Sequence, residues 1–243
     1  MVGEWYDLRM LIYLIFLLGA FVRCVFGFGE ALVTTPLLLL LAYNPQHAMA
    51  IIGIIGFVLA LPTMFQNYQL IDGHLIWRLL IGAVFGVPIG LLFLKFGNVV
   101  LLKKGIGLLL IFYGVINLMP KLVSDREIRL SSVFVGVVSG FLGGAINTHG
   151  APIAIYGRLK NWSPEYLRTN LQTYFGIVGL VIIIGQGLSG LWDATVFWTL
   201  LRLIPGLMIV AVFAELTVKY VNPKQLTQYL LYFFIVIGGI MLF

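Results

Sequence analysis

Apolar residues fill almost the whole chain, and short polar stretches divide it into ten segments. These segments run over residues 8–27, 30–43, 47–66, 74–94, 100–119, 131–145, 150–159, 165–187, 194–216 and 226–243. Turn-forming pairs such as Asn44-Pro45 and Asp72-Gly73 lie between them. A helix needs about 20 residues to span the hydrocarbon core of a bilayer. The pattern therefore predicts an all-α polytopic membrane protein, in which the shorter segments are half-helices or steeply inclined pieces.

Two of the apolar stretches, residues 27–36 and 143–152, combine glycine and proline so that a helix is interrupted. In each, a proline follows the first glycine by nine residues. The residues that predict the breaks are Gly27, Gly29, Pro36, Gly143, Gly144 and Pro152. Non-helical backbone at membrane depth persists only where protein buries it or water reaches it. A duplicated break therefore predicts a polar cavity near the midplane between two related halves, the arrangement of a secondary transporter.

The only markedly polar stretch, residues 121–129, divides the chain into halves of nearly equal length. We predict a first transmembrane repeat over residues 1–119, a connecting loop over residues 120–130 and a second repeat over residues 131–243. Each repeat has about five helical segments.

Paired signals support this internal repeat because they recur in the same order in both halves. Residues 95–98 (Lys-Phe-Gly-Asn) match residues 219–222 (Lys-Tyr-Val-Asn), and Gly114 matches Gly238 at the same offset. Five passes in each half, or three passes and a re-entrant pair, make the repeats inverted, whereas four passes make them parallel. We favour inverted repeats. Both arrangements put the termini outside the cytoplasm, because Lys and Arg accumulate in cytoplasmic loops.

Composition agrees with a chain dissolved in lipid. Of the 243 residues, 61% are hydrophobic and 10% are charged, against about 25% charged in an ordinary soluble domain. The net charge of +6 does not indicate nucleic acid, because the basic residues are scattered through short loops. The single Cys24 forms no internal disulfide. We expect a location in the plasma membrane, here a bacterial inner membrane.

No sequence motif indicates an enzyme, a metal site or a cofactor. Cys-x-x-Cys, His-Glu-x-x-His and the phosphate-binding Gly-x-x-x-x-Gly-Lys are missing, and the three histidines are widely separated. We expect the partners of this chain to be a small anionic substrate and the lipid bilayer.

The two breaks supply the candidate substrate-binding residues. A half-helix turns its free N-terminal N–H groups and the positive end of its dipole toward the midplane, which attracts an anion. We expect the donors to be Thr34, Thr35, Asn147, Thr148 and the backbone near Gly150. The alternative is that these side chains only satisfy the opened backbone.

Charged residues within apolar segments are further candidates, because each costs about 2.5–3.5 kcal/mol on insertion scales. Arg23 lies one helical turn before Gly27, where it could attract an anion or pair with Glu30. Arg202 lies inside its segment and could act as a counter-charge, or its side chain could extend to the interface.

Glu30 and His149 are the candidates for proton coupling, since His is the side chain most easily protonated near neutral pH. The alternative for His149 is a purely structural role. Gln172 is a second candidate for the cavity, whereas Gln186 lies near a helix end and is expected to face the membrane interface.

The second break and the residues after it resemble a known family. The residues concerned are Gly143-Gly144, the stretch from His149 to Tyr156, and the stretch from Trp162 to Gln172. They are similar to the second repeat of the sulfite exporter TauE/SafE family of membrane permeases, and the likeness extends over about residues 10–243. The resemblance implies outward transport of small sulfur-containing anions, such as sulfite or an organosulfonate like sulfoacetate.

One position departs from the pattern of that family, because Glu30 lies where a third glycine is often expected. A carboxylate there repels an anion unless it is protonated or paired. The leading hypothesis is a secondary transporter that exports a sulfur oxyanion. A passive channel for a small solute, or a membrane subunit of a larger complex, is the alternative, and the oligomeric state is left open.

Overall fold

The computed structural model describes residues 2–64, 68–119, 130–220 and 223–243, and this part of the chain is helical without strands. The helices are α1 (Val2–Phe26), α2 (Glu30–Leu40), α3 (Pro45–Met64), α4 (Gly73–Phe96), α5 (Val99–Leu118), α6 (Ser132–Ile146), α7 (Gly150–Leu159), α8 (Pro164–Leu188), α9 (Ala194–Tyr220) and α10 (Pro223–Leu242), with a short 3-10 helix η1 (Tyr68–Leu70) before α4. Each predicted segment overlaps one of these α-helices, so the all-helical prediction is confirmed for the described residues. The polar stretch predicted to connect the halves, residues 121–129, lies outside the described residues.

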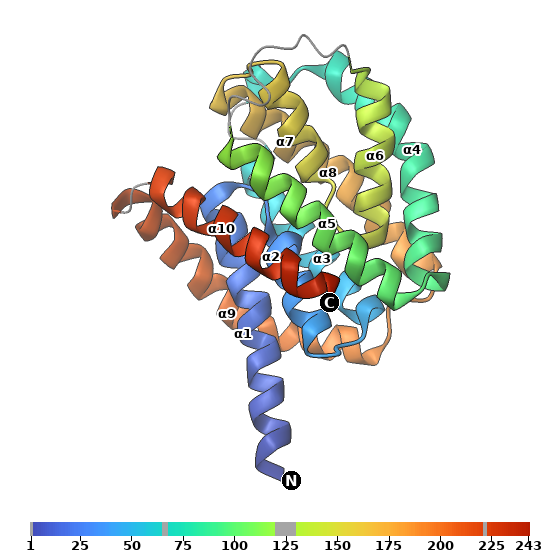
Figure 1. Cartoon of the computed structure of the whole chain (residues 1–243), viewed down its shortest axis with the longest axis vertical. Helices are drawn as coiled ribbons and strands as arrows, with labels where there is room; N and C mark the ends of the chain where they lie inside the picture. Colours follow the sequence, from blue (N-terminus) through green and yellow to red (C-terminus); the bar gives the residue numbers. More distant parts are fainter. Residues whose placement is uncertain (1, 65–67, 120–129, 221–222) are drawn as a thin grey trace.

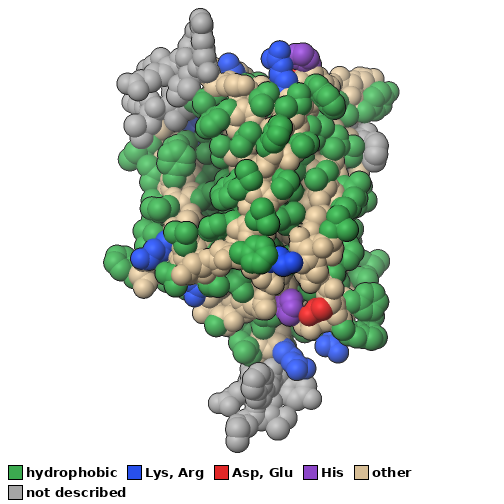
Figure 2. Space-filling view, turned by 90° about the vertical axis from the view of Figure 1, so that its right-hand side faces the viewer, with side chains coloured by type: hydrophobic (Ala, Val, Ile, Leu, Met, Phe, Trp, Pro, Cys, Tyr) green, Lys and Arg blue, Asp and Glu red, His purple; other side chains and the backbone are tan. Residues whose placement is uncertain are grey.

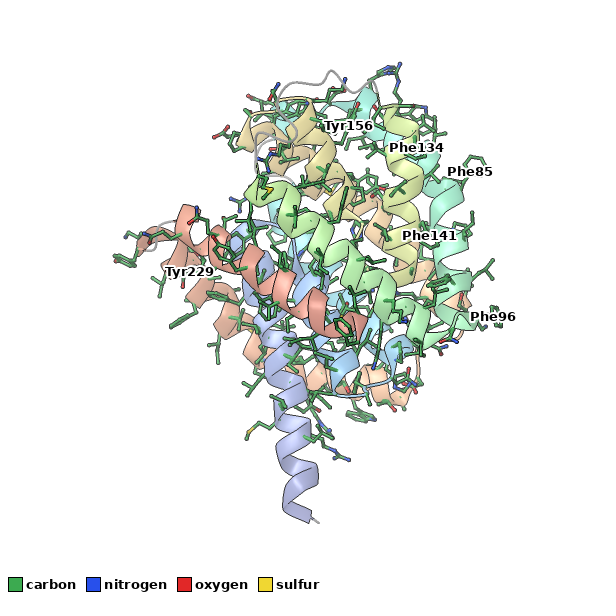
Figure 3. All side chains as sticks on the ribbon, viewed as in Figure 1. Phe85, Phe96, Phe134, Phe141, Tyr156 and Tyr229 are labelled. Atoms are coloured by element: carbon green, nitrogen blue, oxygen red, sulfur yellow. The ribbon has the colours of Figure 1, made fainter. Side chains whose placement is uncertain are left out.

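Seven of the described helices are long and apolar enough to cross a membrane: α1, α3, α4, α5, α8, α9 and α10. Their outward faces are apolar. Phe85 and Phe96 of α4, for example, project away from the bundle and are 64% and 74% exposed (Figure 3). Hydrophobic side chains cover the middle of the face in Figure 2, with charged side chains mostly toward its two ends. Lipid is the solvent that such a surface requires.

The remaining helices α2, α6 and α7 belong to two hairpins, α1–α2 and α6–α7, each with a break of three residues. In the first hairpin, α2 returns alongside α1, so that Gly19 lies against Thr34. In the second, α7 returns alongside α6, and the hydroxyl groups of Ser132 and Tyr156 lie 3.0 Å apart. Residues 27–29 and residues 147–149 are not helical, and a new helix begins after each of these breaks.

Left-handed backbone makes both breaks. Gly27 and Gly29 have φ angles of 81° and 97°, and Asn147 has a φ of 53°. Glycine adopts this region freely, and asparagine is one of the few other residues that tolerate it. Asn147 therefore occupies in the second break the place that Gly27 occupies in the first.

The structure corrects where the second break lies. Gly143 and Gly144 are in the last turn of α6, and the break begins three residues after Gly144. Pro36 and Pro152 lie inside α2 and α7. Pro152 is the third residue of α7, where a backbone N–H has no helical partner, so the proline removes no hydrogen bond there.

Helices pack reciprocally between the two halves of the chain (Figure 1). The first helix of each half contacts the fourth of the other, because α1 packs on α9 and α6 packs on α4. The third helices, α3 and α8, contact each other, as do the fifth helices, α5 and α10. In the last pair, Gly107 lies against Gly238, and Gly114 lies against Leu231.

The closest of these contacts is a glycine seam between α4 and α6. A glycine recurs at every fourth position in both helices, and a side chain at any of them would collide with the backbone of the other helix. The seam consists of Gly82, Gly86, Gly90, Gly136, Gly140 and Gly144. Small residues at this spacing let membrane helices approach until their backbones touch.

Candidate functional site

A buried cavity lies between the two breaks. Its walls are Arg23 of α1, residues 28–32 and 147–151 of the two breaks, part of α3, and Phe175 and Gly179 of α8. About 30 Å³ of it is open to the centres of water-sized molecules. One water needs roughly 10–15 Å³ measured in this way, so the cavity has room for about two waters.

Two helices begin at this cavity. Glu30, Ala31 and Leu32 form the first turn of α2, and Gly150 and Ala151 begin α7; all of them line the cavity. The first backbone N–H groups of a helix have no partner within the helix and carry the positive end of its dipole. Two such ends on one buried space favour an anion.

Arg23 and Glu30 bring opposite charges to the same space. Nε of Arg23 lies 3.9 Å from Oε2 of Glu30, and the two residues are 7% and 3% exposed. The guanidinium also lies over the ring of Phe175, 4.8 Å from its centroid, a cation–π geometry. The distance between Arg23 and Glu30 exceeds that of a hydrogen bond, so the pair is a loose one.

Carboxamide groups support the second break. Asn147 Nδ2 donates a hydrogen bond to the carbonyl of Met49 (2.6 Å), and Gln186 Nε2 donates to the same carbonyl (3.2 Å). Both amides reach the backbone of α3 because Gly53 has no side chain; a Cβ there would lie 2.8 Å from Oε1 of Gln186. Gly56 makes the same room for the Glu30 carboxylate, 3.0 Å from where its Cβ would be.

His149 is held mainly through its backbone and its ring face. Its carbonyl accepts a hydrogen bond from the hydroxyl of Ser139. Its ring lies edge to face with Phe175, with 4.6 Å between the centroids. Beside it, the Thr148 hydroxyl donates to the carbonyl of Ile146 over 3.1 Å, which satisfies backbone opened by the break.

Four residues that line the cavity carry buried polar atoms without a hydrogen-bond partner in the protein: Nε and Nη2 of Arg23, Oε1 of Glu30, Oδ1 of Asn147 and Nδ1 of His149. Oε1 of Gln172 and Oε1 of Gln186, which are outside the lining, also lack one. Such atoms are uncommon in folded proteins, and each calls for an explanation. A polar ligand or water in the cavity would supply the missing partners.

Several residues predicted for the site lie elsewhere. Thr34 and Thr35 are buried in α2, against Gly19 and the sulfur of Met49, and do not line the cavity. Gln172 does not line it either; its Nε2 donates to the carbonyl of Gly27, which fixes the first break.

Arg202 is exposed and borders a second, more open pocket between α1 and α9, whose volume is about 510 Å³. Its Nη1 lies 3.4 Å from the hydroxyl of Tyr13. The structure therefore does not bring Arg202 together with Arg23.

Among the residues at the cavity that were not predicted from the sequence are Gly53, Gly56 and Phe175 of its lining and Gln186, which lies against Gly53. The expectation that Gln186 faces the membrane interface is wrong, because the residue is fully buried. The spacing of Gly53 and Gly56, one turn apart on α3, is a signal that could have located the wall opposite the breaks.

A comparison with protein-family models matches residues 11–242 to the family described as sulfite exporter TauE/SafE. The chain belongs to the TauE/SafE family. Family membership over nearly the whole chain confirms the resemblance seen in the sequence. Together with the seven span-length helices, it makes the chain a multi-pass membrane protein of a transporter family. No curated protein and no solved structure matches the chain.

Proposed function

We propose that this TauE/SafE protein is a secondary transporter that exports a small sulfur-containing anion, sulfite or an organosulfonate, across the plasma membrane. The observation that carries the proposal is the meeting of two helix N-termini and the Arg23 guanidinium at one buried cavity. Positive potential from three sources, at a cavity lined mostly by buried residues, suits an oxyanion.

The binding groups follow from the lining of the cavity. The first N–H groups of α2 and α7 are donors with no side chain to reposition, and Arg23 adds a full charge. Asn147 and Thr148 orient the second break, with the unpartnered carbonyl oxygen of the Asn147 amide available to a protonated oxygen of the substrate.

The two halves work as inverted repeats in this proposal. Nε2 of His47 at the start of α3 lies 2.9 Å from a carboxylate oxygen of Asp193, which follows the end of α8. The third helices of the two halves therefore run in opposite directions, which supports inversion. Repeats of this kind suit alternating access, in which one half rocks against the other around a fixed central site.

The distribution of charge supports an orientation with both termini outside the cytoplasm. Arg78, Arg158, Lys160 and Arg168 lie near the helix ends opposite the His47–Asp193 pair. An excess of Lys and Arg is typical of the cytoplasmic side.

The test is efflux of sulfite from proteoliposomes of the purified protein, with and without an imposed pH gradient, for the wild type and for Glu30→Gln and His149→Ala. We expect saturable efflux that responds to the gradient, and loss of that response in a variant that lacks the proton site. Flux that neither saturates nor responds to the gradient would indicate a channel. No flux of sulfite or of any sulfonate would contradict transport by this chain alone.

A further inference from the structure

Glu30 is the one acidic residue among the described residues that line the cavity. Its Oε2 is the atom nearest to Arg23, while its Oε1 and two nitrogens of Arg23 have no hydrogen-bond partner. An anionic substrate needs the Arg23 guanidinium as its partner, and the Glu30 carboxylate already occupies one side of that group.

No other titratable group near this pair takes the place of Arg23 as the partner of the Glu30 carboxylate, among the described residues. Cys24 follows Arg23 on α1, His149 contributes an imidazole from the second break, and Arg168 of α8 lies against Gly27 beyond the cavity. The part of α3 that faces the pair offers glycine and apolar residues. Arg23 is thus the one cation in contact with the Glu30 carboxylate among the described residues.

Charge prevents an anion from simply joining the pair, because Glu30 and the anion would then share the one guanidinium that lines the cavity. Two anions at one buried guanidinium would leave a net negative charge in a medium of low dielectric constant, which is costly unless one of them is neutralised.

We propose that Glu30 takes up a proton when the substrate binds, so that one proton moves with each monoanion in the same direction. On binding, a proton from solvent forms the O–H bond of the Glu30 carboxyl group, and the freed guanidinium pairs with the anion. On release, that proton returns to solvent on the other side. Transport of a sulfonate or of hydrogensulfite is then electroneutral, and a permanent dianion is a poor substrate. This inference rests on the proposed transport function.

Methanesulfonate is the probe of choice, because it stays a monoanion over the working pH range. Proteoliposomes are given either a pH gradient at zero membrane potential, or a potential set with potassium and valinomycin at equal pH. In the wild type, methanesulfonate flux should follow the pH gradient and ignore the potential, and a trapped pH dye should record one proton for each anion. In Glu30→Gln, flux should respond to the potential and no longer to the pH gradient.

Glu215→Gln is the matched control, since Glu215 is an exposed residue of α9 and does not line the cavity. It should keep the wild-type behaviour. Wild-type flux that follows the potential without proton movement would overturn the inference, even if Glu30→Gln failed to fold. A pH-driven flux that persists in folded Glu30→Gln would overturn it as well. The absence of any sulfite or methanesulfonate flux would instead contradict the proposed function.

Discussion

The seam between α4 and α6 and the cavity between the two breaks are both lined by glycine, but with opposite results. In the seam, the missing side chains let two backbones touch. At the cavity, Gly53 and Gly56 leave room that the polar ends of Asn147, Gln186 and Glu30 occupy. The seam fixes two helices to each other, whereas the residues that line the cavity keep buried polar atoms without a partner in the protein. Substitutions in the two regions should therefore separate stability from transport.

Arg23→Ala should have the largest effect, and this effect should be on transport. The variant loses the charge-assisted hydrogen bonds from the guanidinium to the anion, worth about 1.5–3 kcal/mol each, so sulfite efflux should fall by roughly 10-fold or more. Arg202→Ala is the control, because that arginine is exposed in a separate pocket, and it should leave efflux within about twofold of wild type by the usual behaviour of surface sites. Equal loss in both variants would mean that the cavity has no special part in transport.

Gly140→Leu tests the other side of the comparison, the seam. A Cβ at Gly140 would lie 2.7 Å from Cα of Ala83, and backbone cannot move aside as a side chain can. Overpacking typically costs about 1–3 kcal/mol, and a cost near the upper end lowers the melting temperature by roughly 6–12 °C. In Gly105→Leu, at a position where nothing lies within 4 Å of a Cβ, the melting temperature in detergent should not change. A seam variant that melts like wild type would show that α4 and α6 are free to separate.

Gly53→Ala should weaken transport while sparing the fold. Its Cβ would lie 2.8 Å from Oε1 of Gln186 and 3.2 Å from Oδ1 of Asn147, and both are ends of side chains that can shift. The shifted amides lose hydrogen bonds worth about 0.5–1.5 kcal/mol, so efflux should fall by about 2- to 10-fold. Gly239→Ala, in open space on α10, is the matched control. A lower melting temperature without a loss of efflux would mean that Gly53, like the seam glycines, serves packing and not transport.

Substitution of Asp72, the residue before α4, should have the smallest effect. Unlike the cavity residues, each of its carboxylate oxygens has a hydrogen-bond partner. Its carboxylate accepts hydrogen bonds from the Leu75 N–H and from the Tyr166 hydroxyl, which lower the pKa of Asp72. A lowered pKa contributes stability that is present above the ordinary value of about 3.9 and is lost as the pH falls through the folded-state pKa. The melting temperature of wild type should therefore drop below about pH 4 more steeply than that of Asp72→Asn. Identical acid profiles would exclude this contribution.

Much of the fold could be predicted from the sequence, because lipid imposes a simple pattern on helices. The turn pairs at Asn44-Pro45 and Asp72-Gly73 mark helix ends that the structure has within a residue or two. The first break was located at Gly27 and Gly29, since glycine is the residue that left-handed backbone requires. The second was displaced, because Asn147 takes the left-handed position, while Gly144 belongs to the seam and Gly143 packs against Ile182 and His149.

The site could be predicted only where a residue lies beside a break. Arg23, Glu30, Asn147, Thr148 and His149 all line the cavity. Residues on other helices were not identified correctly, because a face toward lipid and a face toward another helix look alike in an apolar sequence. Gln186 and Arg202 illustrate both errors: the first is buried beside the cavity and the second lies outside it.

Protection of one cysteine by an anion would test most directly whether the cavity is the substrate site. In a Cys24→Ser background, Thr148→Cys places a thiol in the cavity, and Thr195→Cys places one in the separate pocket beside α9. The rate of alkylation by a small neutral maleimide is measured with rising methanesulfonate. We predict that methanesulfonate slows labelling at position 148, over the concentration range in which it is transported, and leaves position 195 unchanged. Transport that saturates while labelling at position 148 proceeds at its original rate would contradict the account.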